Sequence, residues 1–420
     1  MPRYYTNGRI LECLRGREIG GGEGYTSDVR LADADVVVSS RSEFLSALAG
    51  SADVIGIAGS TRIDLSGRDF SLDGRTIVSD RGVDGSPGAL LYTTDHGDDS
   101  PVWDGGSSGR GFITMRGDSR ISGIRLRGPF HDYYDDPRYP GYIPLDSGSA
   151  TERRRQREAR YARGIRILTD DAEVDNCEIY GWSNQAINVG AAWNAYSPHF
   201  HHLHVHDCMM AGFGYGISII RGMPEIEKCY FNATRHSVDG FGYDDCGYTL
   251  EDSVFGPSTS SHAVDMHCLA ENGFSGDLTA GQRVEVRRCT FTFTHSIHDR
   301  WAQAIALRGY PEDRYVVEKN RFVHQIDGDE PVENVANSSY EPVPYRQVNV
   351  GSGWHDWDFI DNQYGVGEAK LSHVGAPVDL DAPHDGRPFI SARCCGRGGP
   401  DPRRTDDGRI TSRPCRRSTF

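Results

Sequence analysis

A short pattern of apolar and polar positions recurs along the middle of the chain. It consists of an apolar residue, two residues that are mostly polar, a Cys, Ser or Asn, one variable residue and a second apolar residue. The copies are VDNCEI (174–179), VHDCMM (205–210), IEKCYF (226–231), LEDSVF (250–255), VRRCTF (286–291), VEKNRF (317–322) and FIDNQY (359–364). Each copy predicts a short strand that turns a corner at its small central residue.

The central residues of these copies are separated by 31, 21, 24, 36, 31 and 42 positions, which is the spacing of a solenoid repeat. Stacked at the strand spacing of ~4.8 Å, they would form an internal column. We expect Cys177, Cys208, Cys229 and Cys289 to be buried free thiols in this column, because Cys packs as a small apolar group. Asn320 and Asn362 would form hydrogen bonds along it.

A second apolar strand follows each corner. The segments are QAINVG (185–190), YGISII (215–220), HSVDGF (236–241), HAVDMH (262–267) and QAIALR (303–308). Their alignment places one inward residue on each turn, namely Ile187, Ile217, Val238, Val264 and Ile305. Two or three short strands per turn, with variable turn lengths, predict an all-β protein: a single-stranded right-handed parallel β-helix.

The two ends of the chain differ from this repeat. SSRSEFLSALAG (39–50) predicts a short helix that caps the N-terminal end of the coil, with a capping-box spacing at Ser40 and Glu43 and an apolar face of Phe44, Leu45 and Leu48. We therefore expect an N-terminal segment with this helix (1–50), a β-helix (51–365) interrupted by an inserted loop (129–163), and a disordered tail (366–420).

Composition narrows the set of partners. The net charge is −15, which argues against nucleic acid because phosphate binding needs a basic surface. No apolar run is long enough to span a membrane, and the first residues contain no secretory signal. Localisation stays open between the cell interior, the extracellular space, a virion or similar particle, and a chain whose true start lies elsewhere. Monomer and trimer are both open.

The N-terminal part of the chain resembles the pectate lyase superfamily. The order is a Gly-rich start (GGGEGYTSDV), a strand and capping helix (VVVSSRSEFLSALAG), an Ile-rich strand (DVIGIAG) and a strand containing TIV (DGRTIVSDRG), over roughly residues 19–82. The resemblance implies a β-helix that acts on carbohydrate. The family's WxDH strand is absent, the corresponding stretch being CEIYGWSNQAI, and so is its motif around the catalytic arginine, so no catalytic residue or calcium ligand carries over.

Titratable residues gather on three successive turns. On a strand, residues of equal parity share a face, so Asp265 and His267 point outward beside inward Val264 and Met266. Stacking then places Asp239 below Asp265 and Arg308 over His267, on the outer surface of the coil. The edge of the same turns gathers Tyr215, Arg235, His236 and His262.

The next turn is enlarged beside this cluster. Its extra residues, THSIHDRWAQ (294–303), bring His295, His298, Arg300 and Trp301 to the same patch. We expect these four residues, with His262, to contact substrate. Surface hydrogen bonding between histidines and aspartates is the plain structural alternative for the cluster.

The chemistry of the cluster favours a polysaccharide lyase acting by β-elimination on an acidic, uronate-containing polymer. This reaction needs a cation for the uronate carboxylate, a base and an acid. Arg308, Arg235 or a calcium ion held by Asp239 and Asp265 would be the cation. His267 or His236 would be the base, and Tyr215 or a second histidine the acid.

Two other functions fit the same residues. A glycoside hydrolase would use Asp239 and Asp265 as its pair of carboxyl groups. A β-helix that binds glycans or serves as a viral spike or surface protein would need no catalytic residue.

Overall fold

The computed structural model describes residues 19–95, 111–129 and 163–324, apart from 183, 192, 209–213, 233, 257–261 and 294–303. It also describes residues 345–347, 357–366 and 390–391. The inserted loop predicted at 129–163 and the tail predicted from 366 lie almost wholly outside these residues.

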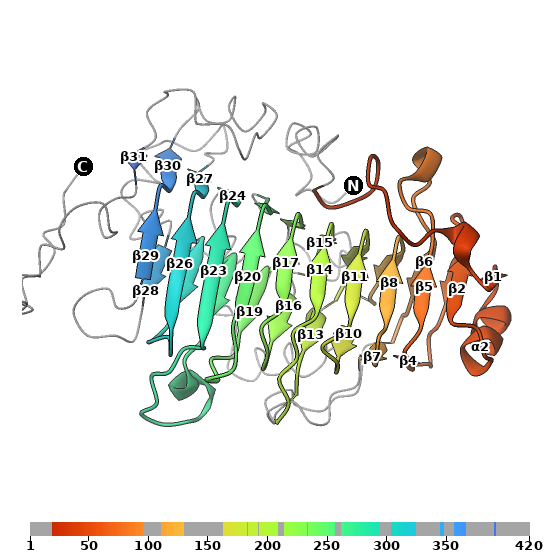
Figure 1. Ribbon diagram of the computed structural model, residues 1–420, viewed down its shortest axis with the longest axis horizontal. Coiled ribbons are helices and arrows are strands. Elements are labelled where there is room, and N and C mark those ends of the chain that lie inside the picture. The colour runs from red at the N-terminus through yellow and green to blue at the C-terminus, as the bar shows by residue number, and fades with distance from the viewer. Residues whose placement is uncertain are drawn as a thin grey trace, which may run out of the picture.

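The described strands coil into three long sheets, A, B and C, so that each turn contributes three strands (Figure 1). Sheet A contains β1 (Val36–Val38), β2 (Val54–Ile57), β5 (Thr76–Val78), β8 (Arg120–Ser122), β11 (Glu173–Asp175), β14 (His199–His201), β17 (Glu225–Glu227), β20 (Tyr248–Glu251), β23 (Arg283–Arg287), β26 (Arg314–Glu318) and β29 (Trp357–Ile360). Sheet B contains β3 (Arg62–Asp64), β6 (Leu90–Tyr92), β9 (Arg125–Arg127), β12 (Glu178–Tyr180), β15 (His204–His206), β18 (Tyr230–Asn232), β21 (Val254–Phe255), β24 (Thr290–Phe293), β27 (Arg321–His324), β30 (Gln363–Val366) and β31 (Ile390–Ser391). Sheet C contains β4 (Phe70–Asp73), β7 (Ile113–Arg116), β10 (Arg163–Ile167), β13 (Gln185–Val189), β16 (Tyr215–Ile219), β19 (Val238–Gly240), β22 (Val264–Met266), β25 (Ile305–Leu307) and β28 (Tyr345–Gln347).

This arrangement is an all-β parallel β-helix, as predicted. Among the described strands every pairing is parallel except that of β30 with β31. The core is the inside of the coil, where each strand contributes its inward residues. Ile187, Ile217, Val238, Val264 and Ile305 pair in register along sheet C and are all fully buried, which confirms the predicted inner column.

The corner between sheets A and B has a fixed backbone geometry. The residue before the column turns the chain with a left-handed φ of 48° to 55°, a region that non-glycine residues seldom adopt. These residues are Asn176, His202, Lys228, Asp252, Arg288, Lys319 and Asp361. The left-handed residue bends the chain from sheet A into sheet B, and the residue that follows it packs inside the coil.

The predicted column is confirmed at six positions and wrong at one. Cys177, Cys229, Ser253, Cys289, Asn320 and Asn362 occupy it and are all buried. Cys208 does not, because it lies beyond the C-terminal end of β15, at the edge of sheet B that is away from the corner with sheet A. Leu203 takes the place between β14 and β15. The error has a physical reason: Asp207 also has a left-handed φ, of 50°, so VHDCMM imitates the corner at a different edge.

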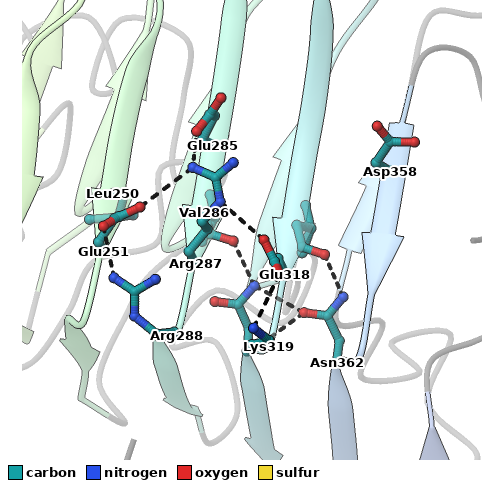
Figure 2. A network of polar contacts seen from close by, with 12 residues as sticks. Leu250, Glu251, Glu285, Val286, Arg287, Arg288, Glu318, Lys319, Asp358 and Asn362 are labelled. Carbon is teal, nitrogen blue, oxygen red and sulfur yellow. Dashed lines mark hydrogen bonds and ion pairs between the residues drawn. The ribbon is translucent and has the colours of Figure 1, made fainter. Parts of the chain in front are cut away.

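Hydrogen bonds run along the column as expected. Asn320 Nδ2 donates to the Val286 carbonyl at 2.8 Å, and the Asn320 amide donates to Asn362 Oδ1 at 2.9 Å. Figure 2 shows the two acceptor residues, Val286 and Asn362. The six described cysteines of the coil, Cys177, Cys208, Cys229, Cys246, Cys268 and Cys289, are free and buried. Burial raises the pKa of Cys177 to about 12, so the thiol stays protonated as a packing group.

The predicted helix is α2 (Arg41–Ala49), which lies at the N-terminal end of the coil beside β1 and β2 (Figure 1). Ser40 Oγ accepts a hydrogen bond from the Glu43 amide, and Glu43 accepts one from the Ser39 amide. Phe44 is fully buried and packs edge-on against Phe70 with 5.4 Å between ring centroids. Three short 3-10 helices complete the described elements: η2 (Leu31–Asp33), η3 (Val83–Gly85) and η4 (Leu269–Asn272). No helix among the described residues is long and apolar enough to cross a membrane.

Candidate active site on the outer face of sheet C

The register of sheet C brings the predicted site residues together. Asp239 on β19 pairs with Asp265 on β22, and Ser218 and Ala306 continue the row on β16 and β25. The row points away from the interior of the coil, because Val238 and Val264 occupy the inward positions. We expected it to lie on an outer surface, yet Asp239 and Asp265 are only 2% and 0% exposed. Burial therefore makes both carboxyl groups sensitive to their immediate neighbours.

Asp265 lies at the centre of the cluster. Arg308 Nε donates to Asp265 Oδ1 at 2.8 Å, and Arg308 Nη2 donates to Oδ2, so the guanidinium holds the carboxylate with both arms. Burial alone would raise the pKa of Asp265, but the charge of Arg308 and the neighbouring imidazoles outweigh it. They hold the pKa of this carboxyl group well below its usual range. Asp265 is therefore ionised although it is buried.

Two imidazoles face the same oxygen of Asp265. His236 Nε2 and His267 Nε2 each lie 3.3 Å from Asp265 Oδ2. His236 Nδ1 lies 3.0 Å from the His262 carbonyl oxygen, which can only accept, so the proton of neutral His236 resides on Nδ1. Burial lowers the pKa of His236 well below its usual value, and its Nε2 is buried without a hydrogen bond among the described residues. His267 Nδ1 lies 3.2 Å from Glu271 Oε2.

The predicted edge of the site is an aromatic stack. The rings of Tyr215 and His236 are 5.0 Å apart, and those of His236 and His262 are 5.6 Å apart and nearly parallel. The Arg235 guanidinium lies 5.7 Å from the centroid of Tyr215. Burial raises the pKa of Tyr215 and lowers that of His262 to about 3. At neutral pH the stack therefore holds a protonated phenol beside neutral imidazoles.

Asp239 has the opposite electrostatics to Asp265. Ser218 Oγ donates to Asp239 Oδ2 at 3.0 Å, whereas Asp239 Oδ1 is buried without a hydrogen-bond partner among the described residues. Burial, reinforced by the charge of Asp265, raises the pKa of Asp239 well above its usual value. The two neighbouring carboxyl groups thus differ in protonation, one neutral and one charged.

Solvent reaches the cluster at a few side chains. The side chains of His267, Arg308 and Glu271 are 14%, 18% and 30% exposed, while His236 and Asp265 are covered. The four residues predicted to contact substrate from the enlarged turn, His295, His298, Arg300 and Trp301, lie outside the described residues. Their role stays a prediction.

The donor atoms of the cluster bear on metal binding. One donor atom each from His236, Asp265 and His267 lies within 4.8 Å of the others. Calcium at Asp239 and Asp265 stays a prediction, and it would require displacement of Arg308, which engages both oxygens of Asp265. The pKa of Asp239 also favours its neutral form, which is a poor calcium ligand.

Sequence reasoning missed two features. Glu271, which joins His267 to Arg308, comes from η4 and has no repeat signal. The second is HFHHLHVHD (199–207), where histidines alternate with Phe200 and Val205. This alternation signals two strands with outward imidazoles, but the placement of Cys208 in the column hid the corner at Leu203.

Comparisons with known proteins add no relative. A scan against models of protein families finds no match, and a search of curated proteins finds none either.

Proposed function

We propose that this protein is a carbohydrate-active β-helix of the pectate lyase-like kind and that it cleaves a uronate-containing polysaccharide by β-elimination. One observation carries the proposal: a buried, ionised Asp265 anchors Arg308 and faces two imidazoles, and His267 and Arg308 extend from this centre to solvent. The cluster combines a fixed cation with a proton acceptor, which are two of the three requirements of the reaction.

The roles follow from protonation and exposure. In β-elimination the base removes the proton beside the uronate carboxylate, a carbon–carbon double bond forms, and the bond to the leaving oxygen breaks. Arg308, held by Asp265 and Glu271, would neutralise the uronate carboxylate, with Arg235 as a second cation. His267 would be the base, oriented by Glu271 through Nδ1. Tyr215, whose pKa is raised by burial, retains the proton that the leaving oxygen needs.

The test is a product assay on several uronate polymers, among them polygalacturonate, alginate and chondroitin. The unsaturated product absorbs ultraviolet light, and His267→Gln should lower kcat/KM by about 10²- to 10⁴-fold, the usual contribution of a general base. His199→Gln is the matched control, because His199 lies on the outer face of sheet A with 39% of its side chain exposed. No unsaturated product from the unaltered protein on any polymer would overturn the proposal.

A glycoside hydrolase is the second candidate, and the opposite pKa shifts of Asp239 and Asp265 favour it. Neighbouring carboxyl groups whose pKa values are pushed apart form the usual acid and base of such enzymes. It ranks second because Arg308 occupies both oxygens of Asp265. New reducing ends without ultraviolet absorbance would identify it, and glycan binding without any product would identify a binding protein.

A further inference from the structure

The segment HFHHLHVHD places a second group of histidines on sheet B, a different sheet from that of the candidate active site. His204 and His206 lie on β15 with Val205 buried between them, so both imidazoles leave the strand on its outer face. The neighbouring strand β12 places Glu178 beside His204 and Tyr180 beside His206. Residues i and i+2 on one strand and a carboxylate on the next can reach a common point.

The donor atoms of these residues do converge. Glu178 Oε1 lies 2.9 Å from His206 Nε2, and one donor atom each from Glu178, His204 and His206 lies within 4.8 Å of the others. The imidazole rings of His204 and His206 are 4.4 Å apart. About 26% of the Glu178 side chain is exposed, so the group is open to solvent on one side.

A carboxylate orients His206 from behind. Asp207 Oδ2 lies 2.9 Å from His206 Nδ1, and the Asp207 side chain is only 3% exposed. A carboxylate on the far nitrogen of a histidine is the usual support of a metal-ligating imidazole, because it fixes the ring and makes Nε2 a better ligand.

Packing fixes the rings further. Tyr180 stacks on His206 with 4.9 Å between centroids and 6° between planes, and Tyr230 packs on His204 at 5.0 Å. The N-terminal segment passes over this point, where the amide of Gly20 donates to the Lys228 carbonyl at 2.8 Å. A side chain at Gly20 would approach Tyr230 Cβ to 3.1 Å, so glycine leaves the rings in place.

The sister cluster on sheet A has the same residue types and a different environment. Glu173, His199 and His201 also bring donor atoms within 4.8 Å. There Arg120 Nη2 already lies 3.2 Å from Glu173 Oε1, and His201 Nδ1 faces His202 Nδ1 in place of a carboxylate. The Arg120 guanidinium thus already pairs with the Glu173 carboxylate. Near Glu178 the arginines are Arg81, whose guanidinium donates to the Gly20 carbonyl and to Asn176, and Arg125, whose Nε donates to the Gly88 carbonyl.

We propose that Glu178, His204 and His206 bind a divalent transition metal ion of the zinc class, with Asp207 as the residue that positions His206. Two imidazoles and one carboxylate form a donor set that zinc prefers, and three protein ligands leave a fourth position for water. The site is independent of the candidate active site on sheet C.

The test uses the full chain, stripped of metal with a chelator and titrated with Zn²⁺ by calorimetry. Co²⁺ serves as a spectroscopic probe, because a four-coordinate site gives strong visible absorption. We expect one equivalent bound tightly, an affinity lowered more than about 100-fold by His206→Gln, and one lowered about 10- to 100-fold by Asp207→Asn. Asn tolerates the left-handed φ of 50° at residue 207, so this variant keeps the turn.

The sister cluster supplies the matched controls. His201→Gln and Glu173→Gln should leave the affinity of the tight site unchanged. The proposal is overturned if the stripped protein binds neither ion, if His206→Gln binds as well as the unaltered protein, or if His201→Gln loses affinity to the same extent. Circular dichroism checks folding, and Glu178→Gln carries the test should His206→Gln not fold.

Discussion

Two Arg–Asp pairs of the same geometry lie in different parts of the coil. Arg288 holds Asp252 with two hydrogen bonds, of 2.8 and 2.7 Å, at the corner of sheets A and B (Figure 2 shows Arg288 and its partner Glu251). Arg308 holds Asp265 in the same two-armed way on sheet C. The side chains of Arg288 and Asp252 are 29% and 23% exposed, whereas Asp265 is fully covered.

The difference lies in the neighbours as well as in the burial. Asp252 and Arg288 belong to a network of arginines and carboxylates that runs from Glu251 through Arg287 to Glu318 (Figure 2). Asp265 instead lies between the imidazoles of His236 and His267. The same ion pair is thus part of a ladder of charged side chains at one place and part of a buried cluster with imidazoles at the other. Burial and imidazoles distinguish the two.

The largest expected effect comes from replacing the arginine of each pair by methionine. Arg308→Met leaves the Asp265 carboxylate buried and uncompensated, and should lower the free energy of unfolding by about 3–5 kcal/mol. Arg288→Met, the matched control, should lower it by about 0–1 kcal/mol, because water solvates the exposed partners. Urea denaturation of both variants at one pH gives the comparison. Equal losses would show that burial does not distinguish the pairs.

A smaller effect of opposite sign is expected at Asp239. Because its folded-state pKa is raised, this group favours folding below its unfolded pKa of about 3.9, and that contribution is lost as the pH rises through the folded value. Asp239→Asn removes the loss, and should therefore stabilise the protein by about 1–3 kcal/mol at pH 8 and by nothing at pH 4.

Denaturation curves at the two pH values measure this change. Asp244→Asn is the control, since the Asp244 side chain is 74% exposed and lies 3.6 Å from Arg221. A variant at residue 239 that is less stable than the unaltered protein at pH 8 would show that the carboxylate has an ionised role in the fold.

The smallest expected effect concerns the ladder itself. A double-mutant cycle between Arg288 and Glu251, whose Nη2 and Oε2 atoms are 2.7 Å apart, should give a coupling free energy of about 0.2–1 kcal/mol. Salt should reduce it, because partly exposed charges are screened. A coupling free energy above this range that does not change with salt would show that the ladder behaves like the buried Arg308–Asp265 pair on sheet C.

Much of the coil could be predicted from the chain. The alternation around Val174, Ile226 and Val286 predicted strands, and the small residues after them predicted corners, because a period of two and a tight turn are local properties. Stacking then aligned Asp239 with Asp265 correctly, since one apolar position on each turn is enough to set the register. The corner at Leu203 was misplaced because a bulky residue stands where the rule expected a small one.

For the candidate site, the sequence predicted which residues are neighbours but not how deeply their side chains are buried or what they contact. The sequence by itself determined that Asp239, Asp265, His267 and Arg308 share one face of one sheet, because parity and register follow from the repeat. Only the tertiary structure decided that Asp265 is buried, that Arg308 turns to it, and that Glu271 joins His267. It likewise decided that Glu178 and Asp207 meet His206 from two sides. The burial of Asp265, its pairing with Arg308 and the approach of Glu178 to His206 depend on segments distant along the chain, and such surroundings push the pKa values of Asp239 and Asp265 in opposite directions.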